Sequence, residues 1–455
     1  MQRIIVIGGV AAGMSAAAEA KRADTKAEVI VFERGNYISY GACGMPYFIQ
    51  NILQKPEALI VLTPEEALKQ KGVDVRIKSE VLDINVKSKK ISVSCEGTSC
   101  VESHPYDKLV IAAGAQPVKP DIPGIQNPGV FFLKTLSDAI RLKSFLLESK
   151  PKKAVLIAEG HIGLEMAEVF LSFGIEVTML VRLNQLCWWL DPDMAMMVEE
   201  KAANHGIKVV KGIRVNSIEE KKSGDKPGNT KLNVMTDKGE YDADFIFISL
   251  GMKPNSELAK AAGIKIGQRG AIEVNDFMET SAPGVYAAGD CATVYNIPLK
   301  ENIYMPRGTT ANKQGRAAGA NAAGGKVGVK GVMGSVVFKF FDLEIGRIGL
   351  TESDLKRKKM QPVSAVIKAA TRPSYFGGGK AIFVKLNADK KTGKFTGGQL
   401  IGGEHVAKRL DTLSAALYNE MSVNEMRQLD FSYAPPFAPV WDPVLIAINQ
   451  LAKKL

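Results

Sequence analysis

Cysteine is scarce in this sequence, with five residues in a chain of 455. A chain with so few cysteines does not form the disulfide scaffold of a small secreted protein. We therefore predict a reducing, cytoplasmic location. The four histidines show no spacing typical of a metal site, and no bound metal is predicted.

Long apolar runs are missing as well. No run of about 18 apolar residues occurs, and the first apolar run, RIIVIGG, begins at Arg3 without a charged segment before it. We predict neither a membrane-spanning helix nor a secretion signal. The formal net charge is +11, but the basic runs at 87–90 and 356–359 are short and carry no interleaved aromatic residues. This charge favours phosphate-bearing small molecules over nucleic acid as partners.

The sequence does contain two βαβ patterns, each a strand, a Gly-rich turn, a helix and a second strand. The first runs through residues 3–33 and the second through 154–181. Such units bind dinucleotides at the turn between the first strand and the helix. After residue 331 the pattern changes to alternating strands followed by helices. The sequence therefore predicts an α/β protein with two Rossmann-like dinucleotide-binding domains and a C-terminal α+β domain.

Domain boundaries are indicated by a Pro-rich segment at 115–124 and by the strand 284–290, which ends in Gly-Asp and is expected to return to the first domain. We predict a discontinuous first dinucleotide-binding domain (1–118 and 251–328), a second one (119–250) and a C-terminal domain (329–455).

The first Gly-rich turn, GGVAAG at 8–13, predicts an FAD site. Gly8 lies at the tight turn and Gly13 where helix and strand pack closely, although Val10 replaces the middle glycine. Glu33 follows at the spacing of an acid that binds ribose hydroxyls. Further support comes from the Ala113-Gly114 turn and from Gly289-Asp290, where a buried aspartate needs a partner such as a ribityl hydroxyl.

The second turn keeps Gly160 and Gly163 but has Ala158 in place of the first glycine. An acid at the end of the next strand would favour NADH over NADPH. That strand ends in Val181-Arg182, so NADPH should at least be tolerated, unless Arg182 is only a solvated surface residue. Glu165, just after the turn, either approaches the nicotinamide or lies on the helix surface.

Cys43 is the candidate redox residue. It lies in SYGACGMPYFIQNI (39–52), at the expected start of a helix, a position that lowers the pKa of a thiol. No second cysteine follows within one turn. Unless Cys43 is structural, it must therefore react with a small thiol, a sulfur atom or an oxygen species.

Taken together, the segments GGVAAG, SYGACGMPY, YDKLVIAAGAQP, GHIGLEMAE, GVYAAGD and ANKQGR resemble those of the pyridine nucleotide-disulfide oxidoreductase family over essentially the whole chain. The single cysteine is similar to the branch that contains coenzyme A-disulfide reductases, NADH oxidases and NADH peroxidases. The resemblance implies FAD, NADH or NADPH, and a homodimer or higher homo-oligomer whose C-terminal domain completes the partner's active site.

The resemblance also implies roles for individual residues. Coenzyme A would be held by residues on the first helix and elsewhere, and two tyrosines would lie near the reacting sulfur. The implied coenzyme A residues are Ser15, Glu19, Arg22, Ser39, Lys71, Asn312 and Trp441, and the tyrosines are Tyr375 and Tyr433. The resemblance also implies FAD contacts beyond those of the first Gly-rich turn, namely Val10, Ala11, Ala12, Arg34, Ala42, Val81 and Ala311. At the second turn it implies two further NAD(P) contacts, Ile162 and Gly251.

We predict an FAD-dependent NAD(P)H reductase of coenzyme A disulfide, persulfide or polysulfide, with coenzyme A as substrate or attached to Cys43. Glu19 and Trp441 depart from the pattern of the disulfide reductases, which makes the persulfide a serious option. The alternatives are an NADH oxidase or peroxidase that cycles through a Cys43 sulfenic acid, and a redox-sensing flavoprotein. Ala11, where oxidases and peroxidases usually carry histidine, argues against the first alternative.

Overall fold

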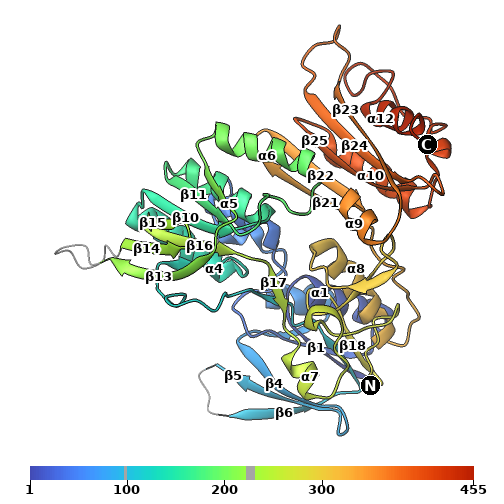
Figure 1. The fold of residues 1–455 in the computed structure, drawn as a ribbon. Helices are drawn as coiled ribbons and strands as arrows, with labels where there is room; N and C mark the ends of the chain where they lie inside the picture. Colours follow the sequence, from blue (N-terminus) through green and yellow to red (C-terminus); the bar gives the residue numbers. More distant parts are fainter. Residues whose placement is uncertain (97–99, 222–230) are drawn as a thin grey trace.

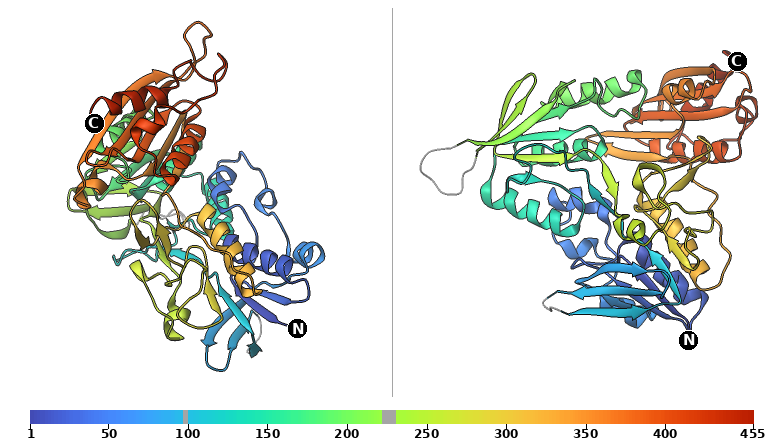
Figure 2. Two further views of the ribbon diagram at one scale, coloured as in Figure 1. Left: turned by 90° about the vertical axis from the view of Figure 1, so that its right-hand side faces the viewer. Right: turned by 60° about the horizontal axis from the view of Figure 1, so that its bottom comes forward.

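The computed structural model describes residues 1–96, 100–221 and 231–455. Figure 1 shows three parts: a blue and gold part at the bottom, a green part at the left, and an orange and red part at the top right. The N-terminus lies in the first part and the C-terminus in the third (Figures 1 and 2).

The first part is built on a parallel sheet of order β18-β7-β1-β2-β3. Its strands are β1 (Arg3–Ile7), β2 (Glu28–Phe32), β3 (Asp74–Arg76), β7 (Lys108–Ile111) and β18 (Val285–Ala287). Helices α1 (Ala11–Ala23) and α8 (Gly308–Ala322) pack closely on each other beside it (Figure 1). A Cβ at Gly319 would lie 2.0 Å from the Ala16 carbonyl oxygen, so only glycine permits this approach.

Smaller elements surround this sheet. An antiparallel sheet consists of β4 (Ser79–Asn85), β5 (Lys90–Cys95) and β6 (Val101–Pro105), and β19 (Val294–Asn296) pairs with β20 (Glu301–Ile303). The short helices are η1 (Ala42–Gly44), α2 (Met45–Ile49), η2 (Pro56–Leu59), α3 (Pro64–Lys71), α7 (Glu257–Ala261) and η3 (Gln268–Gly270).

The second part repeats the parallel pattern, with the order β12-β11-β10-β16-β9. Its strands are β9 (Val130–Phe131), β10 (Lys153–Ala158), β11 (Glu176–Val181), β12 (Lys208–Lys211) and β16 (Phe245–Ser249), and its helices α4 (Leu136–Ser149), α5 (His161–Ser172) and α6 (Pro192–Asn204). An antiparallel sheet of β13 (Val215–Lys221), β14 (Lys231–Thr236) and β15 (Gly239–Ala243) joins it. Where the chain passes between the two parts, β8 (Ala115–Pro117) pairs with β17 (Met252–Pro254).

The third part is an antiparallel sheet of order β21-β22-β25-β24-β23. Its strands are β21 (Val336–Phe340), β22 (Leu343–Gly349), β23 (Pro362–Ala370), β24 (Ala381–Asp389) and β25 (Phe395–Gly402), and its helices α9 (Glu352–Arg357), α10 (Val406–Tyr418), α11 (Val423–Met426) and α12 (Pro443–Ala452). Helix α10 packs on β22 and β25, and α12 packs on β23 and β24.

The predicted fold class is confirmed, because the chain forms two parallel α/β sheets and a C-terminal α+β part. The predicted boundaries fall between elements of different sheets: after β8, after β16 and after α8. None of the helices within the described ranges is long and apolar enough to cross a bilayer.

Candidate active site

The turn after β1 requires its glycines. Gly8 has a φ of +102°, and a Cβ there would lie 2.3 Å from the Ala112 carbonyl oxygen. A Cβ at Gly13 would lie 1.7 Å from the Gly8 carbonyl oxygen, so helix α1 and the turn are in the close contact that the sequence predicts. The Glu33 carboxylate accepts hydrogen bonds of 2.7 Å from the amides of Gly9 and Gly35. The turn and the carboxylate thus share the arrangement of a dinucleotide site.

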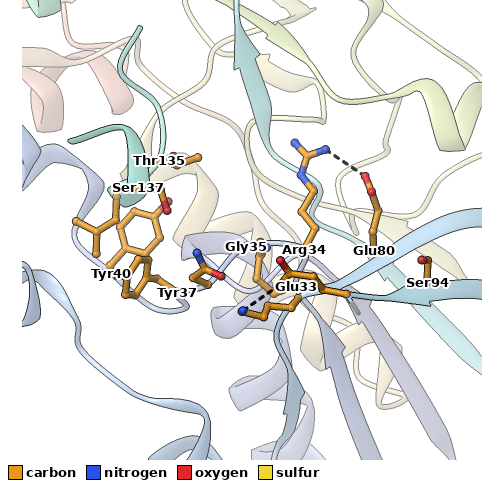
Figure 3. Close-up of a pocket in the computed structure, with 13 residues that line it drawn as sticks. Glu33, Arg34, Gly35, Tyr37, Tyr40, Glu80, Ser94, Thr135 and Ser137 are labelled. Carbon is orange, nitrogen blue, oxygen red and sulfur yellow. Dashed lines mark hydrogen bonds and ion pairs between the residues drawn. The ribbon is translucent and has the colours of Figure 1, made fainter. Parts of the chain in front are cut away.

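A cavity of about 470 Å³ opens beside Glu33 (Figure 3). Arg34 points across it to Glu80, 3.6 Å away, and Tyr40 lies at its other end near Thr135. Burial raises the pKa of Tyr40 to about 12, and the Glu33 carboxylate adds to the effect. The cavity is large enough for a nucleoside and places an acid and a cation within its reach.

At the other end of the predicted FAD site, Gly289 has a φ of +80°, and a Cβ there would lie 2.7 Å from the Ala12 Cβ. The next residue, Asp290, accepts a hydrogen bond of 2.7 Å from Lys134 Nζ. The hydroxyl of Tyr304, whose electrostatic neighbours include Asp290, is buried and has no hydrogen-bond partner among the described residues. A buried orphan hydroxyl calls for a polar ligand. Together with the cavity at Glu33, these residues fit FAD.

Cys43 lies in η1, just before α2, and is exposed. Partial desolvation raises the pKa of the Cys43 thiol, the Glu165 and Asp290 carboxylates raise it further, and Lys134 lowers it. The expected lowering of this pKa at a helix start is therefore wrong. The helix that follows has only five residues, and desolvation of the thiol, together with the two carboxylates, raises the pKa.

Glu165 lies on α5 and acts electrostatically on the Cys43 thiol. Burial raises the pKa of Glu165 to about 7, and Glu168 contributes to the rise. Both carboxyls line a small cavity between α5 and α2, together with Tyr47 and Lys339. Glu165 therefore does not lie on an open helix surface, which was one of the two expectations.

The second dinucleotide turn has a similar construction. Gly160 caps α5, and a Cβ at Gly163 would lie 2.4 Å from the Ala158 Cβ, so this helix also packs tightly on its strand. The Val181 side chain is fully buried in the core of the sheet, so a contact of Val181 with the nucleotide would have to come from its backbone. Ile162 is partly accessible to solvent, and Gly251, with a φ of +101°, is exposed.

The sequence shows no acid beside Arg182 at the end of β11, but in the structure Arg182 has an acidic partner. Its Nε donates to Oε1 of Glu159 over 3.2 Å. Glu159 was not predicted, because the usual ribose-binding acid follows the second strand, here β11, and not the first. The parallel register of β10 and β11, which brings residues 159 and 182 to the same sheet edge, was the available signal.

The implied coenzyme A residues on α1 and α8 do come together. Ser15 Oγ and Asn312 Oδ1 are 2.7 Å apart, and the Glu19 carboxylate pairs with Arg22 and, at 3.2 Å, with Arg316. The remaining members lie on other segments: Lys71 ends α3, the Ser39 amide bonds the Gly9 carbonyl oxygen, and Trp441 is exposed on the third part.

The two tyrosines form a pair on the third part. The hydroxyls of Tyr375 and Tyr433 are 2.6 Å apart, and both side chains are exposed. They lie on the loops after β23 and before α12, which extend from the top of the third part, away from the blue segment that holds Cys43 (Figures 1 and 2). Within one chain, the structure does not bring the tyrosines to Cys43.

One further residue near Cys43, Lys134, was not predicted from the sequence. Lys134 contacts Asp290 and lowers the pKa of Cys43. It lies 156 residues from Asp290 in the sequence, and no local pattern marks it. Cys291 is fully buried, and burial raises its pKa to about 11, as expected for an unreactive thiol. Among the described residues, no group of three or more His, Cys, Asp and Glu side chains is arranged to hold a metal ion.

Comparison with protein families gives two matches. Residues 2–318 match the model described as pyridine nucleotide-disulphide oxidoreductase, and residues 335–443 match the dimerisation domain of the same group. The second match indicates a homo-oligomer.

Individual proteins are similar over the full length. The NAD(P)H sulfur oxidoreductase (CoA-dependent) of Pyrococcus furiosus is 37% identical over 99% of both chains. The NADH oxidase of Methanocaldococcus jannaschii is 36% identical over 100% of this chain and 99% of that one. The solved NAD-dependent persulfide reductase from A. fulgidus has a TM-score of 0.95 at 34% identity and covers 100% of this chain and 83% of its own. The chain therefore belongs to the pyridine nucleotide-disulphide oxidoreductase family.

Proposed function

We propose that this protein is an NAD(P)H-dependent reductase that cleaves the sulfur–sulfur bond of coenzyme A disulfides, or of coenzyme A persulfides and polysulfides, through Cys43. The observation that carries the proposal is the exposed Cys43 thiol, whose charged neighbours Lys134, Glu165 and Asp290 come from three separate segments. The full-length relative named as a CoA-dependent sulfur oxidoreductase supports the choice of substrate.

The sulfur chemistry balances as follows. The Cys43 thiolate attacks one sulfur of the substrate, the sulfur–sulfur bond breaks, and the other half leaves as a thiolate that takes up a proton. With a disulfide, Cys43 is left in a mixed disulfide with coenzyme A; with a persulfide, it is left as its own persulfide. Two electrons that originate from NAD(P)H cleave this bond and regenerate the thiolate, with release of coenzyme A thiol or hydrosulfide.

The chain's own residues prepare this reaction. Lys134 stabilises the Cys43 thiolate, and Glu165 accepts or returns a proton near neutral pH. In the Tyr375–Tyr433 pair one phenol donates to the other, and the accepting phenol keeps its own proton for the leaving thiolate. We place this pair at Cys43 of the partner subunit in a homodimer.

FAD would be held by the turn at Gly8 and Gly13, by Glu33 beside the cavity, and by Asp290 at the other end. When bound, FAD supplies Cys43 with the electron pair of NAD(P)H.

A second candidate is an NADH oxidase, because the Methanocaldococcus jannaschii relative carries that name. In that reaction a Cys43 sulfenic acid would be reduced to thiolate and water. Ala11, where oxidases and peroxidases usually have a histidine, favours the sulfur substrate.

Mass spectrometry of Cys43 in the purified protein, combined with the variant Cys43→Ser, tests the proposal. We expect a coenzyme A adduct or a persulfide on Cys43. We also expect Cys43→Ser to keep its FAD, because the FAD residues lie elsewhere, and to lose disulfide and persulfide reduction. A sulfenic acid on Cys43 would support the oxidase, and sulfur reduction at the parent rate by Cys43→Ser would rule out the proposed redox centre.

A further inference from the structure

A carboxylate and a guanidinium meet at the carboxyl edge of the second parallel sheet. Glu159 follows β10 directly, and Arg182 follows β11 directly. The two strands are parallel neighbours, so both residues leave the sheet at the same edge. Arg182 Nε lies 3.2 Å from Glu159 Oε1.

The two side chains differ sharply in exposure. The Glu159 side chain is 11% exposed and the Arg182 side chain 74% exposed. The Glu159 backbone is fixed as well, because its carbonyl oxygen accepts from the Cys187 amide. A carboxylate largely removed from water acts more strongly on nearby charges than an exposed one. Most of the guanidinium side chain, in contrast, remains open to a ligand.

The pair lies where a nucleotide would place its adenosine ribose. In this type of sheet the pyrophosphate lies at the start of the helix that follows the first strand, here α5, and the ribose lies over the ends of the first two strands. A free ribose 2′-hydroxyl donates to a carboxylate, whereas a 2′-phosphate is repelled by a carboxylate and attracted by a guanidinium.

Two lysines near this edge already have partners. Lys211 ends β12 and pairs with Glu199 at 2.6 Å, and Lys238 Nζ donates to the Lys211 carbonyl oxygen. Glu159 and Arg182 are the ion pair that directly follows β10 and β11 at the predicted ribose position.

We propose that Glu159 supplies, from the turn, the ribose-binding acid that the end of β11 lacks, and that the Glu159–Arg182 pair sets the choice between NADH and NADPH. Glu159 binds the 2′-hydroxyl of NADH. Arg182 leaves Glu159 to bind the 2′-phosphate of NADPH, and the opposing charges keep the two affinities close. This inference rests on the nicotinamide nucleotide as electron donor in the proposed function.

Binding of ADP-ribose and of its 2′-phosphate to the FAD-loaded protein tests the pair without hydride transfer. Titration calorimetry at low ionic strength gives both dissociation constants. We expect Glu159→Gln to tighten the 2′-phosphate ligand about tenfold and to weaken ADP-ribose several-fold, since a tenfold change corresponds to about 1.4 kcal/mol. Arg182→Met should weaken the 2′-phosphate ligand about tenfold and leave ADP-ribose nearly unchanged. The two variants should thus shift the affinity ratio in opposite directions.

Glu176→Gln is the matched control. It removes a carboxylate from the opposite end of β11, where Glu176 pairs with Lys153, and should leave the ratio at the parent value. Glu159→Asp keeps the negative charge and replaces Glu159→Gln if that variant is unstable. Its ratio of affinities for the two ligands should stay close to the parent ratio. A ratio that remains within twofold of the parent in both Glu159→Gln and Arg182→Met would overturn the inference while the proposed function stands. If neither ligand binds the parent protein, the nucleotide site itself is wrongly placed.

Discussion

The reactivity of Cys43 depends on the pKa of its thiol, which burial, two carboxylates and one cation influence. Desolvation raises the pKa of the thiol most, Glu165 and Asp290 raise it further, and Lys134 lowers it. Lys134 also holds Asp290 through a 2.7 Å hydrogen bond, so a single side chain influences both the thiol and the carboxylate expected at FAD. The thiolate form of Cys43 is therefore controlled by a residue that lies outside the cysteine segment.

We expect Lys134→Met to raise the pKa of Cys43 further, because it removes a cation that lowers this pKa. The higher pKa would reduce the thiolate fraction and slow alkylation of Cys43 several-fold at neutral pH. The measurement is the pH dependence of alkylation in the reduced protein, followed by mass spectrometry of the Cys43 peptide. Lys153→Met, which removes an exposed lysine paired with Glu176, is the control and should leave the profile unchanged. An unaltered profile in Lys134→Met would show that Lys134 does not act on the thiol.

The raised pKa of Glu165 predicts that the stability of the folded protein depends on pH. Burial raises its pKa from 4.5 to about 7 in the folded protein, so the folded state binds more protons than the unfolded state between these values. Stability should therefore fall as the pH rises from about 4.5 to 7, by at most about 3 kcal/mol. Glu165→Gln removes this fall, and its thermal midpoint should drop less than that of the parent between pH 5 and pH 8. Equal drops in parent and variant would mean that Glu165 titrates normally.

At the scale of the elements, the glycine of a βα turn decides whether helix and strand can meet. We expect Gly13→Ala to lose most of its bound FAD and to lower the thermal midpoint, because a Cβ there would lie 1.7 Å from the Gly8 carbonyl oxygen. The absorbance ratio of flavin to protein gives the FAD content. Gly160→Ala is the comparison, since nothing lies within 4 Å of a Cβ at Gly160, and it should retain its FAD. FAD retained in full by Gly13→Ala would contradict the tight packing of α1 on its turn.

The sequence predicts the elements well because their signals are local. The apolar run at residues 3–7 is β1, and the Ala-rich segment after the turn is α1. The relations between elements are not local. Glu159 meets Arg182 only because β10 and β11 are neighbours, and Lys134 reaches Asp290 across two parts of the molecule. The direction of the Cys43 pKa shift was missed for the same reason, since the burial of the thiol and its neighbours Glu165 and Asp290 depend on distant segments.

At the scale of the whole molecule, the third part presents an unusual surface. Its loops expose large apolar and aromatic side chains, which a monomer would leave in water. These are Tyr375, Phe376, Tyr433, Phe437, Val440 and Trp441. Residues 335–443 also match a dimerisation domain. The tyrosine pair Tyr375–Tyr433 therefore lies on a surface that suits contact with a second copy of the chain.

This arrangement predicts complementation between two inactive variants. A Cys43→Ser homodimer should be inactive, and a Tyr433→Phe homodimer should reduce coenzyme A disulfide or persulfide about 10²-fold more slowly, the scale of a lost proton donor. In a mixed dimer with tyrosines acting across the interface, one site combines Cys43 from one chain with Tyr433 from the other and is intact, while the second site lacks both. A purified heterodimer with two different tags should recover about half of the parent activity per dimer. If Tyr433 acted on Cys43 of its own chain, each site of the heterodimer would lack one residue, and the activity would stay near the average of the two homodimers.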